Sequence, residues 1–388
     1  MLVQKFGGTS VQTLEKITRV ANFIYKNLSV YKKIVVVVSA MGQTTNNLTN
    51  EICSIAENPP LREVDQLLSI GEIKSASLLA TALIKLGAKA ISLTGWQTGI
   101  FTDKNFGGAF IEDIDTSRIL NYFKTYDILV VTGFQGVTIN GDITTLGKGG
   151  SDTTAVALSA SLSCGCEIYT DVEGIYTCDP KIFKNAKKLE NISFAELMEA
   201  SASGAKVMET RSVEIASKYQ VGLYIAKSLE EKKEGTFVGV ETKNFESMAI
   251  KNLVVQDSNY ELKIEIQKEQ NLSGLFEILA TTRQKIQGAK IAENCFLCII
   301  EEKNKKNIEK ILKKHNFKYN FQNFGAKITL IGSGFQTHIL ALKNIFQALE
   351  DVGVKVTGLS ITEISVTFLV DEKDKGNAIR ALSQKLSL

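Results

Sequence analysis

The chain has 388 residues, more than one hydrophobic core usually supports and typical of two or three domains. Its 44% hydrophobic and 22% charged residues are ordinary for a globular protein, and a net charge of +3 excludes the strongly basic surface of a nucleic-acid or anionic-membrane binder. We expect a cytoplasmic protein, because no apolar run approaches the ~20 residues of a spanning helix and no basic-then-apolar leader precedes Lys5.

Apolar runs and helical patterns alternate through the first 230 residues. Continuous β-branched runs suit strands that are buried on both faces of a parallel sheet. The alternation predicts an α/β domain with helices on both sheet faces and ligands bound outside the carboxyl ends of the strands. Strands are predicted at Leu2–Phe6, Ile34–Val38, Ala90–Leu93 and Ile128–Phe134, and helices at Val11–Tyr25, Val64–Leu86 and Thr153–Leu162.

The pattern changes after the polar, charged stretch Glu230–Asn244, which is typical of a junction. The elements beyond it follow roughly the order of two βαββαβ units, a weak internal repeat. Because lysines beside paired glycines are absent there, we predict that the catalytic part of the chain ends near residue 230. Strands are predicted at Leu262–Ile266, Cys295–Glu301, Ala326–Gly332, Val354–Val356 and Ile364–Val370, and helices at Leu272–Ile286, Lys305–His315, Ile339–Val352 and Lys375–Leu386.

Two segments, Lys5–Ser10 and Gly147–Asp152, each place a lysine beside paired glycines and a hydroxyl. Glycines let backbone N–H groups approach an anion, lysine supplies a point charge, and a following helix N-terminus adds positive potential. Gly204–Lys206 is a third turn with a lysine. A P-loop is excluded, because the stretch from Gly141 to Lys148 has one residue too many between its glycines. We therefore predict a polyphosphate site assembled from several turns.

Three further features each have a functional and a structural interpretation. Ser39–Thr45 follows a buried strand and either offers hydroxyls and backbone donors to a ligand or forms a helix N-cap turn. Glu72 is a lone carboxylate in an apolar stretch, where a solvated helix residue is the usual case. Tyr176, in the polar loop that begins at Thr170, either packs on a base or belongs to a simple turn.

The cysteines and histidines do not form a pattern that points to chemistry. Cys164 and Cys166, and also Cys295 and Cys298, are spaced like metal ligands, but no histidine is near either pair. Buried cysteine usually behaves as a small hydrophobe, so no metal site is predicted. The two histidines come late in the chain, which argues against a histidine general base or a Ser-His triad in the half with the glycine motifs.

In order and spacing, the polar segments of the first half resemble those of the aspartokinases. The resemblance spans the whole chain; it is specific through residue 215 and looser afterwards, where the tail resembles paired ACT regulatory domains. It implies the amino-acid kinase (carbamate-kinase-like) fold, an open, mostly parallel sheet sandwiched by helices, followed by two βαββαβ ACT-like domains. The segments that carry it are Lys5–Ser10, Ser39–Gly42, Thr44–Asn46, Ser69–Glu72, Gly133–Gly136, Thr144–Asp152, Tyr169–Tyr176 and Gly204–Val207.

The resemblance also implies a domain organisation and an activity. A catalytic domain would cover residues 1–235, a linker 236–248, and two ACT-like domains 249–322 and 323–388, which can interleave. The implied reaction is the ATP- and Mg²⁺-dependent phosphorylation of the L-aspartate side-chain carboxylate to 4-phospho-L-aspartate, the first step toward lysine, threonine and methionine. A homo-oligomer, such as a dimer through the ACT-like domains, is implied. Two alternatives stay open: a sister kinase acting on another small acid, and a non-catalytic amino-acid sensor on the same fold.

The family pattern assigns roles to individual residues. Lys5 would hold the transferring phosphoryl group, Asp152 would orient Lys5 and Lys206, and Lys206 would compensate charge on the nucleotide side. Glu72 would pair with the substrate's α-ammonium. No residue is expected to hold a metal by itself. The ATP-binding set is Lys5, Gly7, Gly8, Ser39, Thr170, Asp171, Tyr176, Lys181 and Lys206, and the substrate-binding set is Thr45, Glu72, Lys148 and Ser151.

One departure from the family pattern concerns Lys148, where the family usually has arginine. Arginine grips a carboxylate with two parallel hydrogen bonds, whereas lysine offers a point charge. We therefore expect weaker or altered binding of the amino-acid substrate.

A second departure concerns feedback regulation. Related effector loops carry an acidic residue before Pro-Gly, or Ser-His-Pro-Gly, whereas this chain has Gln270–Gly274 and Gln336–Ile339, both without proline. We expect lysine and threonine to inhibit this protein weakly or not at all. Titrating its kinase activity with each amino acid measures this, and strong inhibition by either contradicts the expectation.

Overall fold

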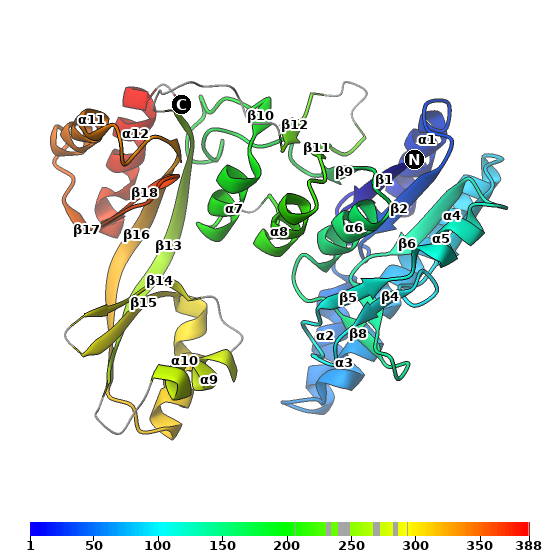
Figure 1. Ribbon diagram of the computed structural model, residues 1–388, viewed down its shortest axis with the longest axis horizontal. Coiled ribbons are helices and arrows are strands. Elements are labelled where there is room, and N and C mark those ends of the chain that lie inside the picture. The colour runs from blue at the N-terminus through cyan, green and yellow to red at the C-terminus, as the bar shows by residue number, and fades with distance from the viewer. Residues whose placement is uncertain are drawn as a thin grey trace. The chain divides into compact units, whose positions relative to one another are not determined.

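The computed structural model places most of the chain in two compact units (Figure 1). The first unit comprises residues 1–176 and 188–243, and the second comprises residues 177–187 and 244–388. The predicted linker at 236–248 stays a prediction, because much of it is not described. The described residues are 1–205, 207–229, 234–239, 249–266, 272–281, 286–292, 294–386 and 388.

An eight-stranded sheet forms the centre of the first unit. Neighbouring strands run parallel except for β12, which is antiparallel to β11. Strand β1 lies between β2 and β9, so the direction of winding reverses beside it, and such a reversal is where open sheets bind ligands. In sheet order the strands are β10 (Asn191–Ile192), β12 (Thr236–Val238), β11 (Leu223–Lys227), β9 (Gly165–Thr170), β1 (Leu2–Phe6), β2 (Ile34–Val38), β6 (Ile128–Thr132) and β3 (Ala90–Leu93).

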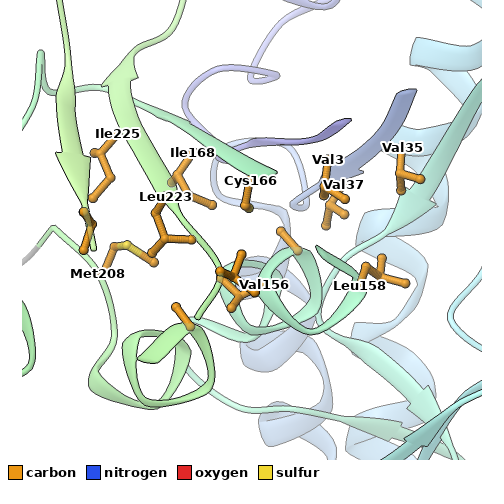
Figure 2. Close-up of a cluster of buried hydrophobic side chains, with 14 of the residues drawn as sticks. Val3, Val35, Val37, Val156, Leu158, Cys166, Ile168, Met208, Leu223 and Ile225 are labelled. Atoms are coloured by element: carbon orange, nitrogen blue, oxygen red, sulfur yellow. The ribbon is translucent and has the colours of Figure 1, made fainter. Parts of the chain in front are cut away.

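Helices cover both faces of this sheet. Phe6 and Val36 belong to a core with two helices on one face, and Val3, Val35 and Val37 belong to a core with four helices on the other (Figure 2). Successive strand residues point to opposite faces, which is why the central strands are apolar throughout. The predicted open, mostly parallel sheet sandwiched by helices is confirmed. The helices of the first face are α1 (Leu14–Asn27) and α4 (Ile70–Lys85), and those of the second are α5 (Thr116–Tyr122), α6 (Gly150–Ser161), α7 (Phe194–Ala202) and α8 (Thr210–Lys218).

The first unit also contains elements that the sequence did not reveal. Helix α2 (Thr44–Ile55) begins with a run of Thr and Asn, which have low helix propensity. A separate four-stranded sheet consists of segments of three or four residues, too short to show a period-two pattern. Its strands are, in order, β5 (Ile111–Ile114), β4 (Ile100–Thr102), β7 (Gln135–Val137) and β8 (Ile143–Thr145).

One helical stretch departs from the expectation that no apolar run would suffice to cross a membrane. Among the described residues, Leu61–Lys85 is long and apolar enough by composition, and 50% of its apolar window is buried inside the protein. The stretch consists of α3 (Leu61–Leu68) and α4, and Leu79 and Leu83 of α4 pack in the core beneath the sheet. The core helix of a globular domain can have this same length and apolar composition.

The second unit is built on a six-stranded sheet in which all neighbouring strands run antiparallel. Its helices are α9 (Leu272–Thr281), α10 (Glu302–Lys314), α11 (Ile339–Glu350) and α12 (Lys375–Leu386), with a short 3₁₀ helix, η1 (Glu372–Asp374). In sheet order the strands are β14 (Gln287–Ala292), β15 (Cys295–Glu301), β13 (Ala249–Glu265), β16 (Tyr319–Ser333), β18 (Ser365–Val370) and β17 (Val356–Ile361).

Strands β13 and β16 are long because each serves two hydrophobic cores. Leu253 of β13 packs in a core with α11 and α12, whereas Leu262 of the same strand packs in another core with α9 and α10. Register shifts between Gln256 and Asn259 separate the two parts of β13. The predicted pair of βαββαβ halves is therefore joined through shared strands.

Residues 177–187 fall inside the predicted 1–235 domain but pack with the second unit. The N–H of Leu253 donates to the carbonyl oxygen of Thr177 at 2.7 Å. Phe183 and Ala186 pack against the core around α11 and α12. The segment therefore adds a short piece of backbone beside β13.

Candidate active site

The carboxyl ends of β1, β2 and β9 lie at one edge of the eight-stranded sheet. The N–H of Gly7, directly after β1, donates to the carbonyl oxygen of Tyr169 in β9 at 3.2 Å. The N–H of Ser39, directly after β2, donates to the carbonyl oxygen of Phe6 at 3.2 Å. The predicted polar turns after these strands therefore share this edge.

Lys5 and Asp152 bring the two glycine segments together. The Lys5 ammonium lies 2.7 Å from a carboxylate oxygen of Asp152, and the two side chains are 10% and 13% exposed. Asp152 sits in the first turn of α6, which follows Gly149 in a left-handed conformation with φ of 70°. A Cβ atom added to Gly7 would lie 3.5 Å from the Lys5 ammonium. A buried cation therefore lies between a glycine turn and a helix N-terminus, a favourable arrangement for an anion.

Gly8 packs directly against the turn that follows β2. A Cβ atom added to Gly8 would lie 2.7 Å from the carbonyl oxygen of Ala40, closer than a side chain tolerates. The N–H of Gly42 donates to the carbonyl oxygen of Gly8 at 3.1 Å. The glycine at position 8 is therefore required by the close approach of the two turns.

Glu72 is a buried carboxylate beside the same turn, so it is not the solvated helix residue of the structural interpretation. It lies in the first turn of α4 and is 3% exposed. Its Oε1 atom accepts the N–H of Ala40 at 2.9 Å, while its buried Oε2 atom has no hydrogen-bond partner. Burial raises the pKa of Glu72 to about 8. A buried, unsatisfied carboxylate oxygen is costly unless a cation or donor reaches it.

Ser151 and Thr45 are the other predicted substrate residues near this edge. Ser151 is buried in the first turn of α6, and a Cβ atom added to Gly133 would lie 2.6 Å from its hydroxyl oxygen. Thr45 is half-buried in the first turn of α2. Both hydroxyls therefore lie at helix N-termini: Thr45 in α2, which follows β2, and Ser151 in α6, against the glycine that comes directly after β6.

The predicted nucleotide-binding residues are distributed over several segments. Thr170 ends β9, and its hydroxyl donates to the Asp171 carboxylate at 3.1 Å. The Tyr176 hydroxyl donates to Glu173 at 2.7 Å within the same loop. Lys181 lies in the segment that belongs to the second unit. Lys206 lies outside the described residues.

Comparison with known proteins decides the family. Residues 1–227 match the family model of the Amino acid kinase family, and residues 328–386 match that of the ACT domain. The aspartokinase of Geobacillus stearothermophilus is 38% identical over 397 residues, covering 100% of this chain and 97% of that protein. The chain belongs to the amino acid kinase family, among the aspartokinases. This confirms the family that the polar segments of the first half resemble.

Solved structures agree with this fold. E. coli aspartokinase III, in complex with aspartate and ADP, superposes with a TM-score of 0.83 at 22% identity, covering 100% of both chains. The aspartate kinase from Synechocystis superposes with a TM-score of 0.57 at 32% identity, covering 100% of this chain and 69% of that one. At these identities the first comparison supports the aspartokinase fold, and the second supports the family.

In this aspartokinase, Lys148 is strongly exposed and has an acidic neighbour that the sequence did not reveal. Its side chain is 88% exposed, and its ammonium lies 2.6 Å from the carboxylate of Glu209, which precedes α8. Asp65 and Arg211 also contact the segments around Lys148 and were not predicted. A signal for Asp65 was available, because it falls on the apolar stripe of α3 formed by Leu61 and Leu68.

Proposed function

We propose that this aspartokinase transfers the γ-phosphoryl group of MgATP to the side-chain carboxylate of L-aspartate, giving 4-phospho-L-aspartate and ADP. The observation that carries the proposal is the buried Lys5–Asp152 pair between two glycine turns, at the edge of the sheet where ligands bind. The product is an acyl phosphate, which suits the first step of lysine, threonine and methionine synthesis.

The chemistry requires no general base. A free aspartate side chain has a pKa of about 3.9 and is ionised at neutral pH. One carboxylate oxygen forms a bond to the γ-phosphorus while the bond from that phosphorus to the bridging oxygen breaks, and ADP leaves with the electron pair. The protein has to relieve repulsion between two anions and align them.

We assign Lys5 to binding the phosphoryl group while it is transferred. Its ammonium would contact the γ-phosphate oxygens, with Asp152 keeping it oriented, and the N–H groups of Gly7 and Gly8 would donate to phosphate oxygens. Lys206 would compensate charge on the nucleotide side. Positive groups fixed in advance at the developing charge lower the barrier, because no reorganisation is needed during the reaction.

The substrate residues are assigned by charge. Glu72, with its unpartnered buried oxygen, would pair with the α-ammonium of aspartate. Lys148 would attract the α-carboxylate, and the hydroxyls of Thr45 and Ser151 would donate hydrogen bonds to the substrate. The two ends of the amino acid would thus be held by opposite charges.

The nucleotide would contact Ser39, Thr170, Asp171 and Tyr176. We treat Mg²⁺ as part of the substrate MgATP, held largely by phosphate oxygens and water, as this ion commonly is in phosphoryl-transfer sites. The ion would neutralise charge on the phosphates.

We further propose a cytoplasmic enzyme that assembles as a homo-oligomer through its ACT-like domains. All six cysteines are free thiols, which suits a reducing compartment. Light scattering of the purified protein tests the assembly.

The proposed activity is tested by incubating the protein with MgATP and L-aspartate and trapping the acyl phosphate with hydroxylamine. We expect aspartyl hydroxamate and ADP in equal amounts. Hydroxamate from glutamate but not from aspartate would indicate the sister kinase. Nucleotide binding without any hydroxamate would indicate the sensor.

Substituting Lys148→Arg is expected to lower the KM for aspartate by about 3- to 10-fold, with kcat changed less than about 2-fold, since a bidentate pair replaces a point charge. Steady-state kinetics against aspartate measure this. Lys85→Arg, an exposed site on α4, is the matched control. An unchanged KM in Lys148→Arg counts against the assignment of Lys148.

A further inference from the structure

Asp65 is a fully buried carboxylate for which the proposed chemistry has no use. It lies on α3 and is 0% exposed. Its oxygens accept the N–H of Thr145 at 2.8 Å, the hydroxyl of Thr145 at 2.6 Å and the N–H of Gly107 at 2.9 Å. Because a buried charge is costly, such a group fixes the geometry of the donors that surround it.

These donors belong to two segments that lie against each other. Thr145 is the last residue of β8, and residues 146–150, here called the glycine turn, follow it directly. Gly107 belongs to the loop between β4 and β5, and its carbonyl oxygen lies 3.3 Å from where a Cβ atom on Gly147 would be. The N–H of Ala109, in the same loop, donates to the carbonyl oxygen of Thr145 at 2.9 Å. Asp65 therefore joins α3, the loop and the start of the glycine turn.

Arg211 of α8 binds the same two segments. Its guanidinium donates to the carbonyl oxygens of Leu146 at 3.0 Å and Ala109 at 2.8 Å, and it lies 4.5 Å from the centre of the Phe110 ring. Asp65 thus binds backbone N–H groups, and Arg211 binds backbone carbonyl groups of adjoining residues. The glycine turn is fixed by a buried anion and by a half-buried cation.

We propose that Asp65 is a positioning residue for phosphoryl transfer: by fixing Thr145, it sets where the glycine turn delivers Asp152 against Lys5. Asp152 follows the glycine turn by two residues, and its carboxylate is 2.7 Å from the Lys5 ammonium. A small displacement of the turn moves Asp152 and misdirects Lys5. Misplacement by about 1 Å costs up to about 100-fold in rate. This inference rests on the proposed function.

Two neighbouring threonines of β8 give a matched pair of variants. Thr145→Val deletes the hydroxyl that reaches Asp65. Thr144→Val deletes an equally buried hydroxyl, which pairs with the Thr102 hydroxyl at 2.6 Å. Each variant removes one buried hydrogen bond, and Thr145→Val should lose more stability because its hydroxyl donates to a carboxylate. At a temperature where both variants are fully folded, the difference in their kinetics reports on positioning.

We expect Thr145→Val to lower kcat about 10-fold with the KM for MgATP changed less than about 2-fold, whereas Thr144→Val keeps a kcat within about 2-fold of the parent. Thr145→Ser, which retains the hydroxyl, should restore kcat. Thermal unfolding of all three variants shows that the comparison is made on folded protein.

The proposal is overturned if Thr145→Val and Thr144→Val have the same kcat, or if Thr145→Ser is as impaired as Thr145→Val. Asp65→Asn presents an amide to the backbone donors and should lower kcat at least as much as Thr145→Val. If Asp65→Asn does not fold, the comparison of Thr145→Val with Thr144→Val still tests the positioning role of Asp65. Absence of hydroxamate from the parent protein is a different result, since it contradicts the proposed function itself.

Discussion

Replacing Lys5 with alanine is expected to lower kcat/KM for MgATP by about 10³-fold, as the loss of one fixed group at the developing charge does elsewhere. The Lys5 ammonium is mostly buried and already paired with Asp152, so neither water nor a mobile side chain can replace it during the reaction. The loss should fall mainly on kcat, because the charge on the transferring group is stabilised most in the transition state. Hydroxamate formation at saturating aspartate measures it.

Lys33→Ala is the matched control. Lys33 pairs with Asp127 at 2.9 Å at the opposite end of the sheet, and its side chain is 31% exposed. This variant should keep a kcat within about 2-fold of the parent, because exposed ion pairs contribute little. Lys5→Ala also leaves the Asp152 carboxylate buried without its partner, so its unfolding should be followed by circular dichroism. Lys5→Arg keeps a cation beside Asp152 while moving its position; near-normal activity in either Lys5 variant would show that the ammonium does not hold the phosphoryl group.

The central sheet could be predicted from the sequence because its signal is local. The run Ile34–Val38 is buried on both faces, so every residue is apolar and the strand is visible without its neighbours. The small sheet gave no such signal, since β7 (Gln135–Val137) and β8 (Ile143–Thr145) are three residues each. The full length of β13 was also missed, because its two parts face different cores and a register shift separates them.

The site was predicted to the extent that its residues lie in glycine motifs. Lys5 and Asp152 belong to such motifs, and the structure shows them as an ion pair. Sequence alone could not show that Glu72 would be buried, since α4 places it against Ala40, which comes 32 residues earlier. Arg211 was missed for the same reason, since its hydrogen bonds go to backbone carbonyl groups of distant segments, which the sequence does not mark. Asp65 was also missed, although its place on the apolar stripe of α3 was a usable signal.

Substituting Glu72→Gln is expected to raise the KM for aspartate by about 100-fold, equivalent to about 2.7 kcal/mol, while leaving the KM for MgATP nearly unchanged. The amide oxygen can still accept the N–H of Ala40, so the turn after β2 should keep its shape. What is lost is the negative charge of the buried carboxylate, which we assign to the substrate's α-ammonium. Glu63→Gln, an exposed carboxylate on α3, is the matched control and should have a normal KM for aspartate.

The same substitution should change the pH dependence of stability. Burial raises the pKa of Glu72 to about 8 in the folded protein from the model-compound value of 4.5. The folded state therefore holds a proton that the unfolded state releases between these values. The contribution of Glu72 to stability is fully present below pH 4.5 and is lost as the pH rises toward 8, by about 1.4 kcal/mol for each pH unit. Glutamine has no such dependence, so the Tm of Glu72→Gln relative to the parent should increase from pH 5 to pH 8 in thermal unfolding at both pH values.

Aspartate binding should be coupled to the protonation of Glu72. A bound ammonium stabilises the ionised carboxylate and lowers the pKa of Glu72, so at pH 7 the parent protein should release protons when aspartate binds. Isothermal titration calorimetry in two buffers with different ionisation enthalpies measures that release as a buffer-dependent heat. Glu63→Gln should show the same buffer dependence as the parent, and Glu72→Gln, titrated at higher aspartate concentration, should show none. If the parent's heat is independent of buffer, or if Glu72→Gln retains the dependence, then Glu72 is not the group that receives the ammonium, and the cost of its burial must have another cause.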